Sequence, residues 1–215
     1  MTFLPPGSDP VTGSNFYFRP EEGDNRVRCL APPIVGWVGW TAARKPLRRP
    51  VDTAAPSIPT IDESEVVIDD KNVIRKFWAL PIWDYAARRI KVWEIGQSTI
   101  QRAIKKLAES ADWGDPRRFD LIVTRTTDSG NTSYTVMPAP KKRDEQPAIV
   151  AAWKEVVARG FDISRLFDGG DPFNPSRSNR PNGPSPTGFA DETYFDAPPT
   201  GDDMPPADDA EPLPF

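Results

Sequence analysis

Aromatic and basic side chains occur close together in several short stretches of this 215-residue chain, which has seven tryptophans. Two of these stretches, 34–41 and 76–83, read IVGWVGWT and KFWALPIW. An open aromatic ring can stack on any nucleobase, which is worth about 1–3 kcal/mol per base, and Lys or Arg can contact the phosphates between bases. The residue types therefore favour binding of a single-stranded nucleic acid without sequence preference.

Side-chain alternation along strands predicts which rings are open. Because successive side chains point to opposite faces, Trp37 and Trp40 face opposite ways, and so do Trp78 and Trp83. Trp40 and Trp78 share their faces with aliphatic residues, which predicts core positions, and Trp93, Trp113 and Trp153 are also expected to pack. The expected stacking residues are Trp37, Phe77, Trp83 and Tyr134.

Basic residues near these rings are the candidates for phosphate contacts. Each of them alone is more typical of a solvated surface, but as a set beside open aromatic rings they favour a phosphate track. The expected set is Arg44, Lys45, Arg48, Arg49, Lys76, Arg88, Arg89, Lys91 and Arg125.

The charge is unevenly distributed. From residue 168 onward the chain has ten acidic and two basic residues, a net charge of −8, whereas the whole chain has −4. Residues 1–167 therefore carry +4, and the overall pI of about 5.0 conceals a basic body followed by an acidic tail. A basic body suggests a polyanionic partner.

The acidic stretch 202–215 reads DDMPPADDAEPLPF. Its four prolines prevent a regular helix or strand, and its five like charges extend the chain. It is either a solubility tail or a functional peptide, and the aromatic residue at its tip favours the peptide. We expect its acids to lie transiently over the basic groove, and its tip to enter an apolar pocket of a partner. The expected partner-binding residues are Asp202, Asp203, Asp208, Asp209, Glu211, Leu213, Pro214 and Phe215.

Several kinds of site are excluded by composition. The chain has no His and a single cysteine, Cys29, which excludes a Cys/His zinc site, a Ser-His-Asp triad and an intrachain disulfide. We expect no cofactor, no metal and no enzymatic activity. The N-terminal residues do not resemble a signal peptide, and no apolar run is long enough for a membrane span, so a cytoplasmic location is expected.

Two other function classes remain open. One is a metal-dependent nuclease, which needs clustered carboxylates, but the available acids lie in an irregular loop without a rigid scaffold. The other is an adaptor whose tail and body both bind proteins. The acids considered for the nuclease are Asp62, Glu63, Glu65, Asp69 and Asp70.

The order of expected elements predicts a mainly β fold. Hydrophobic alternation and turn signals predict a helix capped by Ser98, with Gln101 completing a capping box. This order is typical of a five-stranded Greek-key barrel, the OB-fold, with a helix between the third and fourth strands. The expected strands are 26–30, 34–41 (bent), 76–83, 90–95, 119–127 and 132–137, with a short one at 66–68.

Four regions are expected along the chain. A further helix over 148–159 is predicted to pack on the body. The regions are a flexible segment 1–14, a nucleic-acid-binding domain 15–145 with an irregular insertion 42–72, a helical segment 146–167, and a disordered acidic tail 168–215 rich in Pro and Gly.

Several segments resemble the phage OB-fold single-stranded DNA-binding proteins. The resemblance lies in GDNRVRCL (23–30), FWALPIW (77–83), KVWEIGQSTIQRAI (91–104), WGDP (113–116) and FDLIVTRT (119–126). The stretch DDAEPLPF is similar to the acidic, aromatic-tipped tails of phage and bacterial members. Some members hold zinc, and since this chain lacks the ligands, the resemblance is to the zinc-free kind.

The resemblance implies a protein that binds single-stranded DNA without sequence preference and protects it during phage DNA replication, recombination and repair. It also implies that the tail recruits replication proteins, such as a polymerase, helicase or primase, in the cytoplasm of an infected bacterium. The insertion 42–72 and the helix 148–159 have no counterpart in this resemblance.

Overall fold

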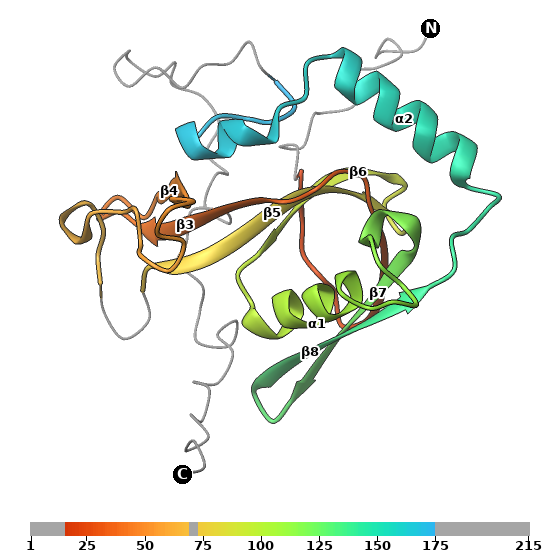
Figure 1. The fold of residues 1–215 in the computed structure, drawn as a ribbon, viewed down its shortest axis with the longest axis horizontal. Helices are drawn as coiled ribbons and strands as arrows, with labels where there is room; N and C mark the ends of the chain where they lie inside the picture. The colour runs from red at the N-terminus through yellow and green to blue at the C-terminus, as the bar shows by residue number, and fades with distance from the viewer. Residues whose placement is uncertain (1–15, 69–72, 175–215) are drawn as a thin grey trace, which may run out of the picture.

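The protein is built on a mixed sheet of eight strands that does not close on itself (Figure 1). The structure is a computed structural model that describes residues 16–68 and 73–174. The mainly β class predicted from the sequence is confirmed. The strands are β1 (Tyr17–Phe18), β2 (Gly23–Cys29), β3 (Ile34–Trp40), β4 (Pro46–Pro50), β5 (Arg75–Asp84), β6 (Arg89–Ile95), β7 (Asp120–Asp128) and β8 (Asn131–Ala139).

Helices are few. In the described residues the α-helices are α1 (Ser98–Ala108) and α2 (Gln146–Ala158), and the 3-10 helices are η1 (Glu63–Glu65), η2 (Pro116–Arg118) and η3 (Ile163–Asp168). No helix among the described residues is long and apolar enough to cross a membrane. The expected flexible segment 1–14 and most of the expected tail, including 202–215, lie outside the described residues.

The ten-residue strand β5 is the centre of the sheet. Its first half pairs with β3 and its second half with β2, while β6 pairs along most of its other edge. The strands β2 and β3 are separated by Pro32 and Pro33, which lack N–H groups and interrupt the ladder. Leu30 N still donates to Pro81 O at 3.0 Å, so β2 and β3 follow β5 like two halves of one bent strand.

The β7–β8 hairpin lies beyond β2. Strand β7 pairs antiparallel with both β2 and β8. The two turn residues, Ser129 and Gly130, have φ values of 50° and 84°. A two-residue turn with two positive φ values matches the twist of the flanking strands, so the hairpin expected from the sequence forms with a tight turn.

The inner face of the sheet forms the main hydrophobic core, and α1 covers part of it. Leu80 and Ile82 of β5 pack there with Trp93 of β6 and with Ile100 and Ile104 of α1. The expected capping box at the start of α1 was wrong. The N-cap position is Gln97 without a side-chain cap bond, and the Gln101 side chain donates instead to the Ile95 carbonyl at 2.7 Å.

The outer face of β5 and β6 is covered by the C-terminal segment 146–173, which contains α2 and η3 (Figure 1). Ile149 of α2 and Leu166 of η3 are buried against the sheet. Phe173 contacts the rings of Phe16 and Phe161, at centroid distances of 5.7 and 4.9 Å. The packed part of the chain therefore extends six residues beyond the boundary expected at residue 167.

This cover overturns one expectation. Phe77 and Trp83 do lie on the opposite face of β5 from Trp78, as alternation predicts, but they are not open. Phe77 is 0% exposed beneath η3 and Trp83 is 4% exposed beneath α2. Alternation along a strand determines the face of a side chain but not whether another segment covers that face.

The insertion 42–72 also differs from expectation. Residues 46–50 form β4, which pairs with β3 at the edge of the sheet. Prolines are tolerated at such an edge because one side of the strand needs no ladder donors. The strand expected at 66–68 does not form, although Val67 N donates a hydrogen bond to Trp40 O at 2.7 Å.

Replacing Trp83 with alanine is expected to destabilise the fold. Deleting a buried Trp side chain leaves a cavity and typically costs about 3–5 kcal/mol. The free energy of unfolding, measured by urea denaturation, should fall by that amount. The same change at Trp113, which is 39% exposed, should cost about 1 kcal/mol or less. Equal unfolding midpoints for the Trp83 variant and the unchanged protein would contradict the burial.

Candidate nucleic-acid interface

Two of the candidate phosphate-binding cations are occupied by buried ion pairs. Arg48 Nη2 lies 2.9 Å from Glu94 Oε2, and the Arg48 side chain is almost fully buried. Lys91 Nζ lies 2.9 Å from Asp84 Oδ2, also largely buried. Breaking a buried pair leaves an uncompensated charge, which is strongly destabilising. These two side chains therefore hold the sheet together and are poor candidates for contact with a ligand.

Four other candidate cations lie at turns at opposite ends of the sheet. Arg44 and Lys45 are exposed in the β3–β4 turn, whereas Arg88 and Arg89 are exposed at the β5–β6 turn. Because β3 runs antiparallel to β5, these turns lie near the two ends of β5. A ten-residue strand spans about 30 Å, so the structure does not bring the four cations into one cluster.

Three candidate residues do come together, on the adjacent strands β4, β3 and β5. Trp37 is paired in register with Arg49 on one side and with Lys76 on the other. Directly opposed residues in antiparallel strands point to the same face, with Cβ atoms about 4.5–5.5 Å apart. Lys76 Nζ lies 5.6 Å from the centre of the Trp37 ring, within cation–π distance. We call these three residues the Trp37 cluster.

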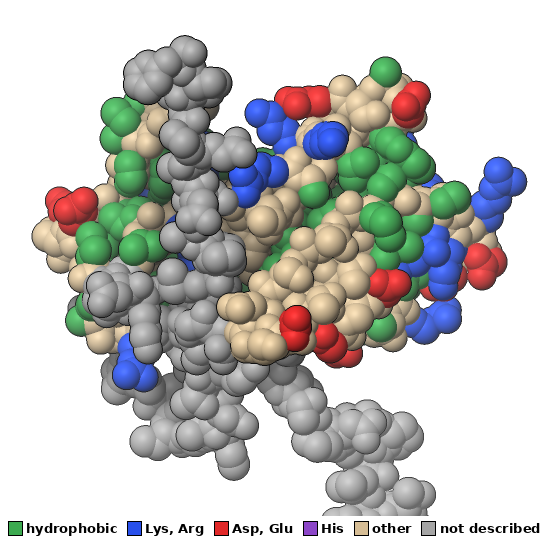
Figure 2. All heavy atoms as spheres, turned by 90° about the horizontal axis from the view of Figure 1, so that it is seen from below, with side chains coloured by type: hydrophobic (Ala, Val, Ile, Leu, Met, Phe, Trp, Pro, Cys, Tyr) green, Lys and Arg blue, Asp and Glu red, His purple; other side chains and the backbone are tan. Residues whose placement is uncertain are grey.

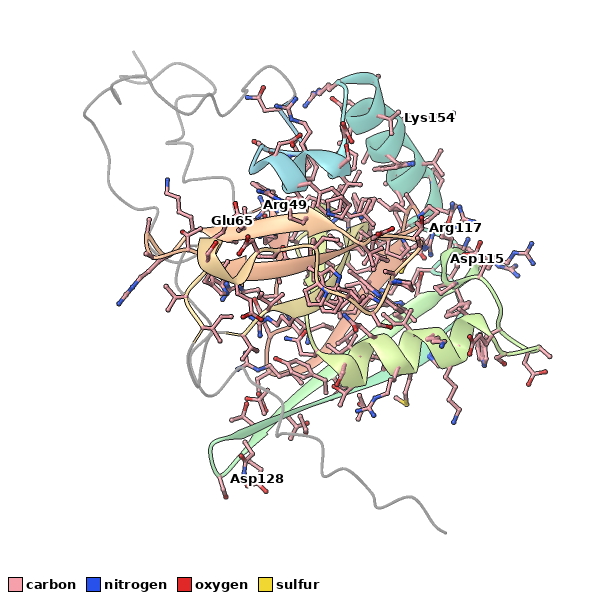
Figure 3. The ribbon with its side chains drawn as sticks, turned by 60° about the vertical axis from the view of Figure 1, so that its left-hand side comes forward. Arg49, Glu65, Asp115, Arg117, Asp128 and Lys154 are labelled. Atoms are coloured by element: carbon pink, nitrogen blue, oxygen red, sulfur yellow. The ribbon has the colours of Figure 1, made fainter. Side chains whose placement is uncertain are left out.

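The Trp37 cluster is partly open to solvent. The Arg49 side chain is 39% exposed, and Trp37 and Lys76 are half-buried. Segment 51–68 follows β4 and lies against the same face. Lys76 Nζ donates to the Pro56 carbonyl at 2.9 Å, and Arg49 lies 3.5 Å from Glu65. Figure 3 shows Arg49 and Glu65 next to each other at the β3–β4 end of the sheet.

The remaining two candidates form a separate pair. Arg125 of β7 and Tyr134 of β8 are partners in the hairpin register, and Tyr134 packs partly against the main core. The hairpin lies on the far side of β2 from β5, and its tip at Asp128 is well away from Arg49 (Figure 3). A single nucleic-acid ligand could contact both this pair and the Trp37 cluster only if it ran across the sheet.

Charge is mixed on the face viewed from below in Figure 2. Lys and Arg side chains among the described residues of that face are interspersed with Asp and Glu and with hydrophobic side chains. They form no continuous basic patch there. The Trp37 cluster is defined by the combination of a ring with two neighbouring cations.

Sequence analysis missed a network around Tyr85. The cationic groups of Arg26, Arg28 and Lys142 lie 5.5, 5.7 and 5.2 Å from the ring centre. The buried Asp120 accepts from Arg26 at 2.8 Å and from Arg28 at 2.7 Å, and burial raises the pKa of Tyr85. The sequence indicates this network through RVRCL, in which the two arginines alternate with apolar residues and therefore point to the same face. Arg28 and Asp120 are almost fully buried and join β2 to β7, whereas Arg26 is partly exposed and Lys142 is exposed.

An apolar cavity of about 270 Å³ lies between α1 and the inner face of the sheet. Trp78, Leu80 and Ile104 are among its lining residues, with Asp115 and Arg117 as the polar ones. Arg117 hydrogen-bonds to Asp115 and lowers the pKa of that carboxyl to about 2. These two charges therefore neutralise each other, which leaves the cavity without a free polar group for orienting a ligand.

Metal-dependent chemistry has no support in the described part of the chain. No group of three or more Cys, Asp or Glu side chains there is arranged to hold a metal ion. Asp62 is used to cap η1, where it accepts from Ser64 N at 2.8 Å. Asp69 and Asp70 lie outside the described residues.

Comparisons of the chain with protein-family models, with curated proteins and with solved structures found no match. The functional assignment therefore depends on the geometry of the described residues and on the sequence.

The thiol of Cys29 is expected to be unreactive in the folded protein. Cys29 is buried in the main core, and its burial, with Asp115 and Asp120 nearby, raises the pKa to about 12. Because the thiolate is the nucleophile, a thiol reagent should label the native protein very slowly, at neutral and at mildly alkaline pH alike. Labelling should become fast in urea. Rapid labelling of the native protein would contradict this placement.

Proposed function

We propose that the protein binds single-stranded DNA without sequence preference, and that the Trp37 cluster is the centre of its binding surface. The observation that supports this most directly is the half-buried Trp37 ring between Arg49 and Lys76 on one face of three neighbouring strands. The ring can stack on a base, and the two cations are placed to contact the phosphates on either side of that base.

The arrangement of strands supports an OB-fold. Treating β2 and β3 as one bent first strand gives the order β6-β5-β2-β7-β8, with α1 between β6 and β7 in sequence. An OB-fold has this order, with its first strand between the second and fourth and its helix after the third. In the described residues β6 and β8 do not pair, and α1 contacts both strands. This arrangement is consistent with a partly open barrel whose gap is filled by the helix.

The position of the Trp37 cluster also supports this function. OB-folds bind oligonucleotides on the face of their second and third strands and at the loop that joins the first and second strands. The C-terminal segment covers that face here, and the joining loop corresponds to β4 and segment 51–74. The cluster lies at the base of this loop, on the opposite face of β3 and β5 from Phe77 and η3. It remains partly exposed, so a strand of DNA bound at the loop can reach it.

The acidic stretch 202–215 extends the proposal. Its acids can steer an approaching protein and its apolar residues Leu213 and Phe215 can anchor in a pocket. We assign to it the recruitment of replication proteins to DNA-bound protein during phage DNA replication and recombination. This part of the proposal is based on residue types alone.

A titration of labelled single-stranded and double-stranded DNA with the full chain, at two salt concentrations, tests the function. Single strands should bind more tightly, because stacking surfaces are hidden in a duplex. Binding should weaken as salt rises, because phosphate contacts release counterions. Equal affinity for the two forms of DNA would disprove the proposal.

Replacing Trp37 with alanine should weaken binding of single-stranded DNA by about 1–3 kcal/mol, the usual contribution of one stacked base. Arg49→Gln should reduce the slope of log affinity against log salt by about one unit, because one phosphate contact is lost. Trp113→Ala is the matched control, since that ring is exposed on another part of the molecule. Unfolding midpoints of each variant should be measured alongside, and an unchanged affinity in folded Trp37→Ala would remove Trp37 from the interface.

A further inference from the structure

Both cations of the Trp37 cluster contact the same segment of the chain. Lys76 Nζ donates to the carbonyl oxygen of Pro56 at 2.9 Å, and Arg49 Nη2 lies 3.5 Å from Glu65 Oε1. A carbonyl oxygen and a carboxylate are acceptors for these cations, as phosphate oxygens are. Segment 51–68 therefore places two oxygen acceptors beside Trp37, one for each cation that flanks the ring.

The backbone around Glu65 is held in place by contacts that do not involve the cations. Val67 N donates to Trp40 O at 2.7 Å, and Thr60 Oγ1 donates to Pro50 O at 2.8 Å. Val66 packs so closely on Gly39 that a Cβ atom at that glycine would lie 2.8 Å from Val66 Cγ1. Only a glycine accommodates this approach, so β3 is shaped to receive the segment at a fixed position.

The contacts to the cations are weaker than these anchors. The side chains of Arg49 and Glu65 are 39% and 46% exposed, and an exposed pair typically contributes only about 0.2–1 kcal/mol. A phosphate strand can therefore replace Glu65 and the Pro56 carbonyl while the anchors on Gly39 and Trp40 remain intact. The two cations would change partners without unfolding of the segment.

We propose that segment 51–68 is a built-in competitor of the nucleic acid, in which Glu65 and the Pro56 carbonyl occupy Arg49 and Lys76 until phosphates displace them. This inference depends on the proposed function, because it concerns regulation of the same surface. The competitor sets a threshold: a ligand must offer both a base for Trp37 and phosphates for the two cations to replace the internal contacts.

The test is the affinity of the full chain for single-stranded DNA after Glu65→Gln, with Glu63→Gln as the control. Both glutamates belong to η1 and both changes remove one negative charge, but only Glu65 has an ion pair with Arg49. At low salt Glu65→Gln should tighten binding about two- to five-fold, the range that an exposed ion pair permits. Glu63→Gln should have a clearly smaller effect, and the difference should fade as salt rises.

A second pair of variants identifies the contact itself. In the background of Arg49→Gln, the change Glu65→Gln should no longer tighten binding, because the pair that it relieves is already absent. A gain that persists in this background, or an equal gain from Glu63→Gln, would mean that only general charge repulsion was removed, and would overturn the proposal.

The outcomes separate this inference from the proposed function. If the unchanged protein binds single-stranded DNA and Trp37→Ala weakens that binding, the function stands whatever Glu65→Gln does. Equal affinities of the Glu65 and Glu63 variants would then refute the competitor alone. Absence of binding by every variant at low salt would refute the proposed function and the competitor with it.

Discussion

Burial of β5 on both of its faces is the constraint on which the rest of the structure depends. Leu80 and Ile82 face the main core, whereas Phe77 and Trp83 face the C-terminal segment. A strand that is apolar on both faces needs a covering layer on each side. Residues 146–173 supply the outer layer, so the broad face of β5 and β6 is closed to ligands. One part of the sheet that remains partly open is the end where β3 and β4 extend beyond the C-terminal segment.

The same constraint determines which cations are available. Within covered parts of the sheet a cation must be paired, as Arg28 is with Asp120 and Lys91 with Asp84, since an unpaired buried charge is costly. Such pairs fix the strands relative to each other but cannot be exchanged for phosphate at low cost. The ion-pair partner of Arg49, Glu65, is exposed, so a phosphate can replace Glu65 at a low cost in free energy. A cation of this sheet is therefore available to a ligand when both its own side chain and its ion-pair partner are exposed to solvent.

The sequence predicted the class of fold and the faces of the side chains, because both follow from local periodicity. It assigned Phe77 and Trp83 correctly to one face, but an alternating pattern contains no information on long-range cover. A usable signal lay in Trp153, Phe161 and Phe173, whose rings make the segment after β8 too apolar for a solvated appendage. The register that joins Trp37 to Arg49 could not be predicted, since it depends on β4, a strand bounded by prolines.

If both proposals hold, two acidic segments compete for the Trp37 cluster, and the physics of the two competitions differs. Segment 51–68 offers Glu65 from a backbone held by its anchors on β3 and β4, so little ordering entropy is lost when the weak contact forms. The stretch 202–215 is joined to the last described residue, Asn174, by 27 residues, and its competition depends on the effective concentration that such a linker provides. A fixed competitor sets a constant threshold, whereas a tethered one is withdrawn as soon as a partner protein binds it. Recruitment of a partner by the tail would then strengthen DNA binding without changing the threshold that Glu65 sets.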